Sequence, residues 1–304
     1  MASHLSTTLG QLELRSPLIA ASGTVGSVWE WAEVADVTPF GAAVAKSVAP
    51  EEWLGRPEPR VAPTATGMLN GIGIQNPGIE DWVSSMAPKM PSIRVPVWGS
   101  SVAEDAEGFA LVAKGLAGAG VSAIEVNLSC PNLEDGQMFS FSADACAAVL
   151  QAVRTAVDLP IGAKLSPNTP EIADVAAACG EAGTDFVVLT NTAYGFGVSL
   201  ETRKPLLSGG VGGYSGPGLK PISLRCVYEV ARANPGLPIV GCGGVVGGAD
   251  VVEYLMVGAS AVEMGTVLMA EPNAGIRIEM ELAATLERLG VSRLSEIIGS
   301  VSEW

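Results

Sequence analysis

The chain has 304 residues, of which 48% are hydrophobic and 16% are charged, and its formal net charge at pH 7 is −15. This composition provides for an extensive core. The acidic balance argues against nucleic acid and anionic membranes as partners, because both are bound through lysine and arginine. The five cysteines are scattered and form no C-x-x-C pair, so they favour a reducing, cytoplasmic setting over a disulfide framework or a metal cluster.

No targeting or membrane segment is expected. The first residues show no basic stretch followed by a long apolar core, and no run reaches the roughly 20 apolar residues of a membrane span. We therefore expect a soluble protein.

Short apolar runs alternate with alanine-rich amphipathic segments along the chain. We expect strands at Pro17–Ala21, Ala42–Lys46, Val95–Gly99, Ala123–Asn127, Pro160–Lys164, Phe186–Thr190, Pro238–Cys242 and Ala261–Met264. Helical patterns lie between them at Ala103–Ala119, Ser142–Val157, Pro170–Ala182, Leu219–Ala233, Ala249–Val257 and Ala274–Leu289. Strands that are apolar on both faces are typical of a parallel sheet covered by helices.

Eight such units without a break in composition predict one α/β domain over residues 1–304, a (β/α)8 TIM barrel, rather than a two-domain Rossmann arrangement. Two connections are too long for simple turns. Residues 47–80 are rich in Pro, Gly and Trp, and residues 191–218 are rich in Gly. Because both follow strands, we expect two long functional loops over the carboxyl-terminal face of the barrel.

Polar residues and glycines stand at the ends of the predicted strands, where barrel enzymes build their sites. They are Ser22, Lys46, Ser100, Asn127, Lys164, Asn191, Gly243, Gly244, Gly265 and Thr266. Asparagine and glycine end strands for reasons of turn geometry alone. A lysine that closes a buried apolar run has no such explanation, so the set as a whole indicates a site.

Lys164 and Lys46 each leave alternatives open. A buried lysine needs a negative partner, which for Lys164 could be an anionic cofactor ring or a protein carboxylate; a Schiff base is a further role for this amine. Lys46 poses the same question, and one lysine could serve a cofactor while the other serves a substrate carboxylate. The glycines after the seventh and eighth strands favour a phosphorylated cofactor, because barrels commonly bind phosphate there through backbone N–H groups.

Cys130 is a candidate base. The chain has one histidine, His4, near its N-terminus, so an enzyme built on it must move protons through another group. Cys130 lies between Ser129 and Pro131 in a polar segment after a strand, and a thiol can act as a base where its surroundings favour the thiolate. The cysteines in helical patterns are expected to be small core residues: Cys146, Cys179 and Cys226.

These residues give the chain a recognisable pattern. From about Leu9 to Leu289 it resembles the dihydroorotate dehydrogenases, specifically their cytosolic class 1. The resemblance rests on the segments Ala21–Thr24, Lys46–Ser47, Thr66–Gly78, Asn127–Asn132, Lys164–Asn168, Asn191–Thr192, Ser215–Pro217 and Gly243–Gly244.

The resemblance implies oxidation of dihydroorotate to orotate in pyrimidine biosynthesis, with FMN accepting a hydride from C6 and Cys130 removing the C5 proton. It implies a substrate site formed by Lys46, Asn70, Gly71, Ile72, Gly73, Ile74, Asn127, Asn132, Asn191 and Thr192. It implies an FMN site formed by Ser22, Lys46, Ser47, Ser100, Asn127, Lys164, Thr190, Gly216, Gly243, Gly244, Gly265 and Thr266, with no metal. Two of these depart from the family pattern, since Ser100 stands where an asparagine is expected and Thr190 where an aliphatic residue is usual.

The segment Thr66–Gly78 is most similar to class 1B. Class 1B implies a homodimer within a heterotetramer, whose second subunit carries FAD and a 2Fe–2S cluster and passes electrons to NAD. Three alternatives stay open at this point: an enzyme of class 1A type that reduces fumarate, a related FMN dehydrogenase acting on another dihydropyrimidine such as dihydrouracil, and a barrel retained as a non-catalytic subunit.

Overall fold

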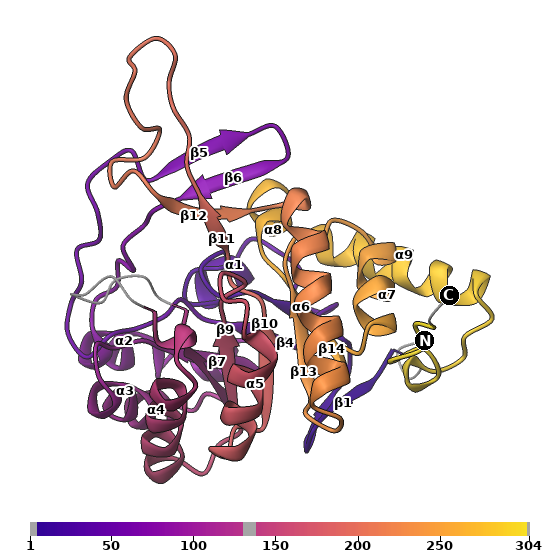
Figure 1. The fold of residues 1–304 in the computed structure, drawn as a ribbon. Helices are drawn as coiled ribbons and strands as arrows, with labels where there is room; N and C mark the ends of the chain where they lie inside the picture. Colours follow the sequence, from indigo (N-terminus) through magenta and orange to yellow (C-terminus); the bar gives the residue numbers. More distant parts are fainter. Residues whose placement is uncertain (1–4, 130–137, 303–304) are drawn as a thin grey trace.

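A closed barrel of eight parallel strands forms the centre of the protein (Figure 1). The computed structural model describes residues 5–129 and 138–302. Neighbouring strands around the barrel follow one another in the sequence, and the last pairs with the first. They are β3 (Leu18–Ala20), β4 (Ala42–Val44), β7 (Val97–Ser101), β8 (Ala123–Asn127), β9 (Ile161–Leu165), β10 (Phe186–Leu189), β13 (Ile239–Cys242) and β14 (Ala261–Met264). The predicted (β/α)8 barrel is confirmed.

One predicted strand is displaced along the chain. The sequence predicts Val95–Gly99, whereas β7 begins at Val97 and continues through Ser100 and Ser101. Both serines are fully buried, and they pair with Glu125 and Val126 of β8. The prediction was wrong because serines after a glycine look like the start of a turn, whereas the parallel ladder extends through them.

The barrel interior is packed with apolar side chains at its amino-terminal end. Trp98 of β7 and Phe186 of β10 lie there with ring centroids 5.1 Å apart. A hairpin of β1 (Thr7–Leu9) and β2 (Leu12–Leu14) adds Leu9 and Leu14 to the same cluster. The hairpin is tied to this end because the Thr7 hydroxyl donates to the carbonyl of Ser260, just before β14. The opposite, carboxyl-terminal end is left for a site.

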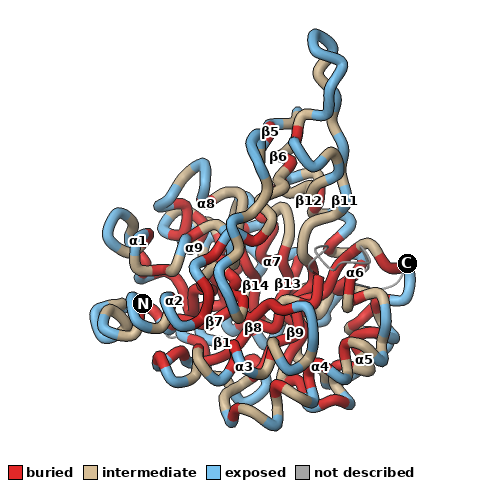
Figure 2. The backbone as a smooth tube through the Cα atoms, turned by 90° about the vertical axis from the view of Figure 1, so that its left-hand side faces the viewer, coloured by how far each residue is buried: buried red, intermediate tan, exposed pale blue. Residues whose placement is uncertain are grey.

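Helices cover the outside of the barrel (Figures 1 and 2). The six predicted helices are confirmed to within three residues as α3 (Ala106–Gly118), α4 (Ala143–Ala156), α5 (Ile172–Glu181), α6 (Lys220–Ala233), α7 (Gly248–Met256) and α9 (Ala274–Arg288). The structure adds α1 (Trp29–Ala32), α2 (Ile79–Met86) and α8 (Thr266–Ala270). Side-chain caps fix two of the starts: Asp105 accepts from Gly108 N at 2.8 Å, and Ser142 accepts from Ala145 N at 3.2 Å. Within the described residues, no helix is long and apolar enough to cross a membrane.

The two long connections, which the sequence predicts as long functional loops, contain strands of their own. Residues 47–80 contain β5 (Val61–Thr64) and β6 (Gly67–Asn70), and residues 191–218 contain β11 (Ala193–Gly195) and β12 (Gly212–Ser215). These strands form one antiparallel sheet in the order β11-β12-β6-β5, which we call the cover sheet. It lies over one end of the barrel, and the exposed connection from β11 to β12 projects beyond it (Figures 1 and 2). The sequence did not predict these strands because they contain glycine and proline, which are depleted in strands generally.

Trp98→Ala is expected to lower the free energy of unfolding by about 3–5 kcal/mol, because it leaves a cavity against Phe186 inside a closed barrel that cannot collapse to fill it. Denaturant unfolding measures the change. Val34→Ala is the control, since Val34 is 72% exposed just after α1, and it should shift stability by less than about 0.5 kcal/mol. Equal effects of the two substitutions would contradict the packed interior.

Candidate active site

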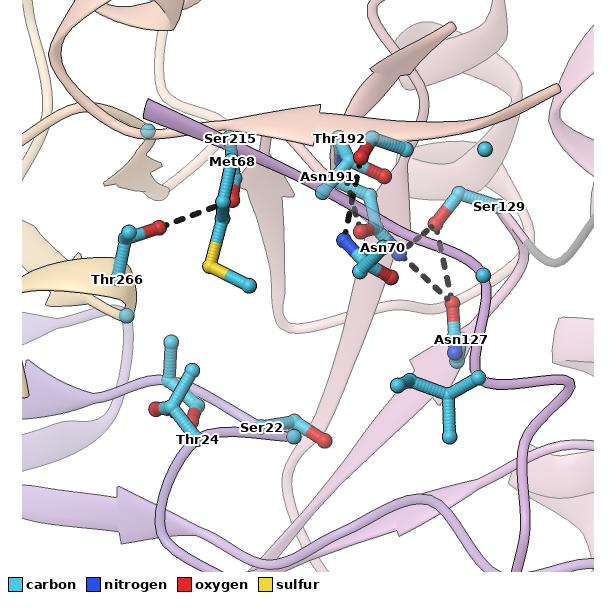
Figure 3. Close-up of a pocket in the computed structure, with 18 of the residues that line it drawn as sticks. Ser22, Thr24, Met68, Asn70, Asn127, Ser129, Asn191, Thr192, Ser215 and Thr266 are labelled. Atoms are coloured by element: carbon cyan, nitrogen blue, oxygen red, sulfur yellow. Dashed lines mark hydrogen bonds between the residues drawn. The ribbon is translucent and has the colours of Figure 1, made fainter. Parts of the chain in front are cut away.

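A cavity of about 490 Å³ lies between the carboxyl-terminal ends of the barrel strands and the cover sheet. Residues that follow the barrel strands form one side of it, and Met68, Asn70, Gly213 and Ser215 of the cover sheet form another. Figure 3 shows Asn70, Asn127, Ser129, Asn191 and Thr192 gathered at one end, away from Met68, Ser215 and Thr266. The cavity thus has chemically different ends.

Lys164 of β9 lies in the cavity lining between two buried carboxylates. Its Nζ is 2.7 Å from Oε2 of Glu263 on β14, and 3.3 Å from each carboxylate oxygen of Glu125 on β8. Burial lowers the pKa of Lys164, but the charges of Glu125 and Glu263 outweigh this effect and raise the pKa above its usual value. Lys164 is therefore an ammonium at neutral pH. We call these three residues the buried triad.

The pKa of Glu125 is raised as well, and for a carboxyl group this shift favours the neutral form. Burial raises the pKa of Glu125 well above its usual range, the charge of Glu263 raises it further, and Lys164 lowers it. The Cys242 thiol also lines the cavity, and burial raises its pKa too, so it is neutral at physiological pH.

An amide and hydroxyl network forms the end of the cavity above β8 and β10 (Figure 3). Asn191 Nδ2 donates to Ser129 Oγ at 2.7 Å, and Ser129 Oγ donates to Asn127 Oδ1 at 3.0 Å. Asn127 Nδ2 donates to Ser47 Oγ at 3.2 Å, and Asn191 Oδ1 accepts from Thr192 N at 2.8 Å. Amides that offer both donors and acceptors in fixed positions suit a planar ligand with carbonyl and N–H groups.

Glycines line the other end of the cavity. Gly244 has φ +70°, and a Cβ there would lie 2.6 Å from the backbone nitrogen of Lys220. Gly216 has φ +102°, and a Cβ there would lie 2.5 Å from the Cα of Gly67. Gly243, Gly265 and Thr266 line the same region, where Thr266 Oγ1 donates to Ser215 Oγ at 3.0 Å. Other backbone thus occupies the place of a Cβ at both positions, and the backbone of these glycines itself lines the cavity.

An ion pair holds the glycine-rich turn after β13. Lys220 Nζ lies 2.6 Å from Oδ1 of Asp250, whose Oδ2 accepts from the backbone nitrogens of Val246 and Gly247 at 2.8 and 2.9 Å. Burial lowers the pKa of Lys220, but the hydrogen bonds that Lys220 donates to Asp250 and Glu253 outweigh this effect and raise it. The turn is therefore fixed without contribution from a ligand.

The structure brings nearly all the predicted site residues together. Those that line the cavity are Ser22, Lys46, Ser47, Asn70, Gly71, Ile72, Gly73, Ile74, Asn127, Lys164, Thr190, Asn191, Thr192, Gly216, Gly243, Gly244, Gly265 and Thr266. Ser100 is fully buried and outside the lining, where its hydroxyl lies 2.9 Å from Ser47 Oγ. Cys130 and Asn132 lie outside the described residues.

Sequence reasoning missed Glu125 and Glu263. Each is an acidic residue inside an otherwise apolar strand, which is a signal in itself, because a carboxylate is rarely buried without a partner. Lys164 stands in a third such strand and supplies that partner. The protein carboxylates that the sequence left open as partners of Lys164 are thus present. Ser129, Met68 and Ser215 were also missed, the last two because the cover sheet was not predicted.

The sequence identifies relatives of the whole chain. Residues 4–286 match the protein family described as dihydroorotate dehydrogenase. The chain belongs to the dihydroorotate dehydrogenase family. A family protein from Maridesulfovibrio salexigens is 41% identical over 300 residues, which cover 98% of each chain. Relatives from Pelobacter propionicus and Alkaliphilus metalliredigens are 38% and 36% identical, covering 98–99% of both chains. All three are named dihydroorotate dehydrogenase B (NAD(+)), catalytic subunit.

Proposed function

We propose that this protein is the catalytic subunit of an NAD-linked dihydroorotate dehydrogenase, which oxidises dihydroorotate to orotate in pyrimidine biosynthesis. Family membership over nearly the full length supports the reaction. The observation that carries the proposal is the cavity itself, which combines a buried lysine, an asparagine network and a glycine-lined end at the carboxyl-terminal ends of the strands.

The cavity fits FMN. The glycine-lined end, where side chains at positions 216 and 244 would collide with backbone, suits a phosphate bound through N–H groups. We assign FMN contacts to Ser22, Lys46, Ser47, Asn127, Lys164, Thr190, Gly216, Gly243, Gly244, Gly265 and Thr266, with Ser100 supporting Ser47 from behind. When bound, FMN supplies the acceptor for the hydride from C6 of the substrate. Lys164 then presents an ammonium to the cofactor's electron-rich ring edge.

The asparagine end fits the substrate. Asn70, Asn127, Asn191 and Thr192 present amide and hydroxyl groups of both polarities, as the carbonyl and N–H groups of a dihydropyrimidine require. Lys46 offers a positive charge for the substrate carboxylate, and residues 71–74 close one wall. Cys130 and Asn132 continue the chain directly after Ser129, a member of this network. Cys130 takes the C5 proton as thiolate, and Asn132 orients the substrate.

The partner assignment rests on the names of the relatives. "Catalytic subunit" and "NAD(+)" in those names support a second subunit that carries electrons to NAD, with FAD and a 2Fe–2S cluster of its own. We propose that two copies of this chain pair within that complex. Exposed apolar side chains on the cover sheet and its projecting connection offer a surface for such pairing, namely Tyr194, Phe196, Val198, Leu200 and Val211.

The purified protein is expected to be yellow, and dihydroorotate should bleach its flavin under anaerobic conditions, because the cavity presents Lys46 to a carboxylate. Absorbance at the flavin band measures this reduction. Dihydrouracil, which lacks the carboxylate, is the control and should bleach the flavin far more slowly. A yellow protein that dihydrouracil reduces and dihydroorotate does not would overturn the substrate assignment.

Cys130→Ala is expected to slow flavin reduction by dihydroorotate by about 100-fold or more, the usual contribution of a general base. Anaerobic stopped-flow absorbance measures the rate. Cys226→Ala removes a buried thiol of α6 that does not line the cavity, and should leave the rate close to that of the unsubstituted protein. Near-normal reduction by Cys130→Ala at every pH would refute the role of the thiol as base.

Gly244→Ala is expected to weaken FMN binding by about tenfold or more, since a displaced turn loses at least one phosphate hydrogen bond from a charged ligand. Quenching of flavin fluorescence measures the dissociation constant. Gly236→Ala is a matched control, because Gly236 also has positive φ (+93°) but a Cβ there meets nothing within 4 Å. Equal losses of affinity in both variants would mean that backbone strain, rather than close approach to the ligand, explains the effect.

A further inference from the structure

The buried triad contains one more acid than base. Glu125 and Glu263 are fully buried, and Lys164 is 5% exposed. If all three groups were ionised, a net negative charge would lie in the centre of the barrel, which is costly in a medium of low polarity. The Cys242 thiol of β13 lies beside the triad, but burial raises its pKa and keeps it neutral. Among the described residues, Lys164 is the cation seen in ion pairs with Glu125 and Glu263, so the triad has one excess negative charge.

One oxygen of the triad also lacks a donor. Oε2 of Glu263 accepts from Lys164, but Oε1 is buried and has no hydrogen-bond partner among the residues that the structure describes. A buried carboxylate oxygen without a donor has lost its hydrogen bonds to water and gained none in return, which is unfavourable. A proton held between Glu125 and Glu263 would supply the missing donor and remove the excess charge in one step. Burial and the mutual repulsion of the two carboxylates favour the same outcome.

We propose that Glu125 and Glu263 share one proton, and that Glu263 is a positioning residue that fixes the Lys164 ammonium beneath the cofactor end of the cavity. Lys164 has three N–H donors. One is directed to Glu263 and one to Glu125, so the third can reach into the cavity that Lys164 lines. The shared proton makes the triad neutral, with one ammonium, one carboxylate and one carboxylic acid.

The consequence for the cofactor rests on the proposed function. A neutral triad lets Lys164 approach the FMN ring without an excess negative charge directly behind it. In the folded protein the acid pair keeps its proton up to the raised pKa, whereas in the unfolded chain the same carboxyl groups lose theirs at their ordinary pKa. The contribution of the pair to the free energy of unfolding therefore falls as pH rises from the ordinary carboxyl pKa to the raised pKa. FMN affinity should fall as pH rises through the raised pKa, where the folded protein loses the shared proton and the triad becomes negatively charged.

Infrared spectroscopy of the full-length protein tests the shared proton directly. At neutral pH, where exposed carboxyl groups are ionised, the protein should show a carboxylic acid C=O stretching band. Glu263→Gln should abolish this band, since the amide can donate to Glu125 and accept from Lys164 in place of the protonated acid. Glu125→Gln should do the same and serves if the first variant fails to fold. Glu229→Gln removes a carboxylate that is 40% exposed and paired with Arg225, and should leave the band unchanged.

The pH dependence of unfolding and of FMN affinity gives the second readout. Glu263→Gln should keep FMN at neutral pH and should lose the decline of both quantities with rising pH, whereas the unsubstituted protein and Glu229→Gln should retain it. Absence of the band in the unsubstituted protein, or its persistence in both glutamine variants, would overturn the proposal. The infrared band requires neither flavin nor substrate, so it tests the shared proton separately from the proposed function. The band can be absent from a protein that dihydroorotate bleaches, and it can be present in a protein that dihydroorotate does not reduce.

Discussion

Closure of the parallel ladder is the constraint on which the rest of this structure depends. Every neighbouring pair is parallel and β14 pairs with β3, so all eight strands run in the same direction and their carboxyl-terminal ends meet at one end of the barrel. Asn127, Lys164 and Asn191 lie far apart in the sequence and become neighbours for this reason alone. The apolar packing around Trp98 and the hairpin of β1 and β2 fill the opposite end, which leaves the polar end as the place where a ligand can bind.

Much of this arrangement could be predicted from the sequence. Apolar runs of four or five residues located all eight barrel strands, and the residues after them located nearly all of the cavity lining. The prediction failed at residues whose type is more common in turns and loops than in strands. Ser100 looks like a turn residue, but the ladder and the Ser47 hydroxyl hold it inside β7. The cover sheet was not predicted because β6 and β12 begin with glycine and pair with each other across more than 100 residues of sequence.

The buried triad shows a different limit. A single acidic residue in an apolar strand signals that a charge must be compensated, but the sequence cannot say by which group. Glu125, Lys164 and Glu263 stand on β8, β9 and β14, and only barrel geometry brings the third to the other two. Lys164 therefore has both of the roles that the sequence analysis treated as alternatives. It is an ion-pair partner of protein carboxylates and also part of the cavity wall.

The cover sheet sets the order in which the site can be assembled. β6 pairs with β12, so that Asn70 lies opposite Gly213. The two strands come from different connections, one after β4 and the other after β10. During synthesis, the amino-terminal half of the chain carries Asn127 and the cover-sheet strand of Asn70, but it lacks β11 and β12, the other two strands of the cover sheet. The cavity gains its cover after β12 has emerged, and its glycine-lined end after Thr266. A cofactor that needs both ends is therefore captured late, by a barrel that is nearly complete.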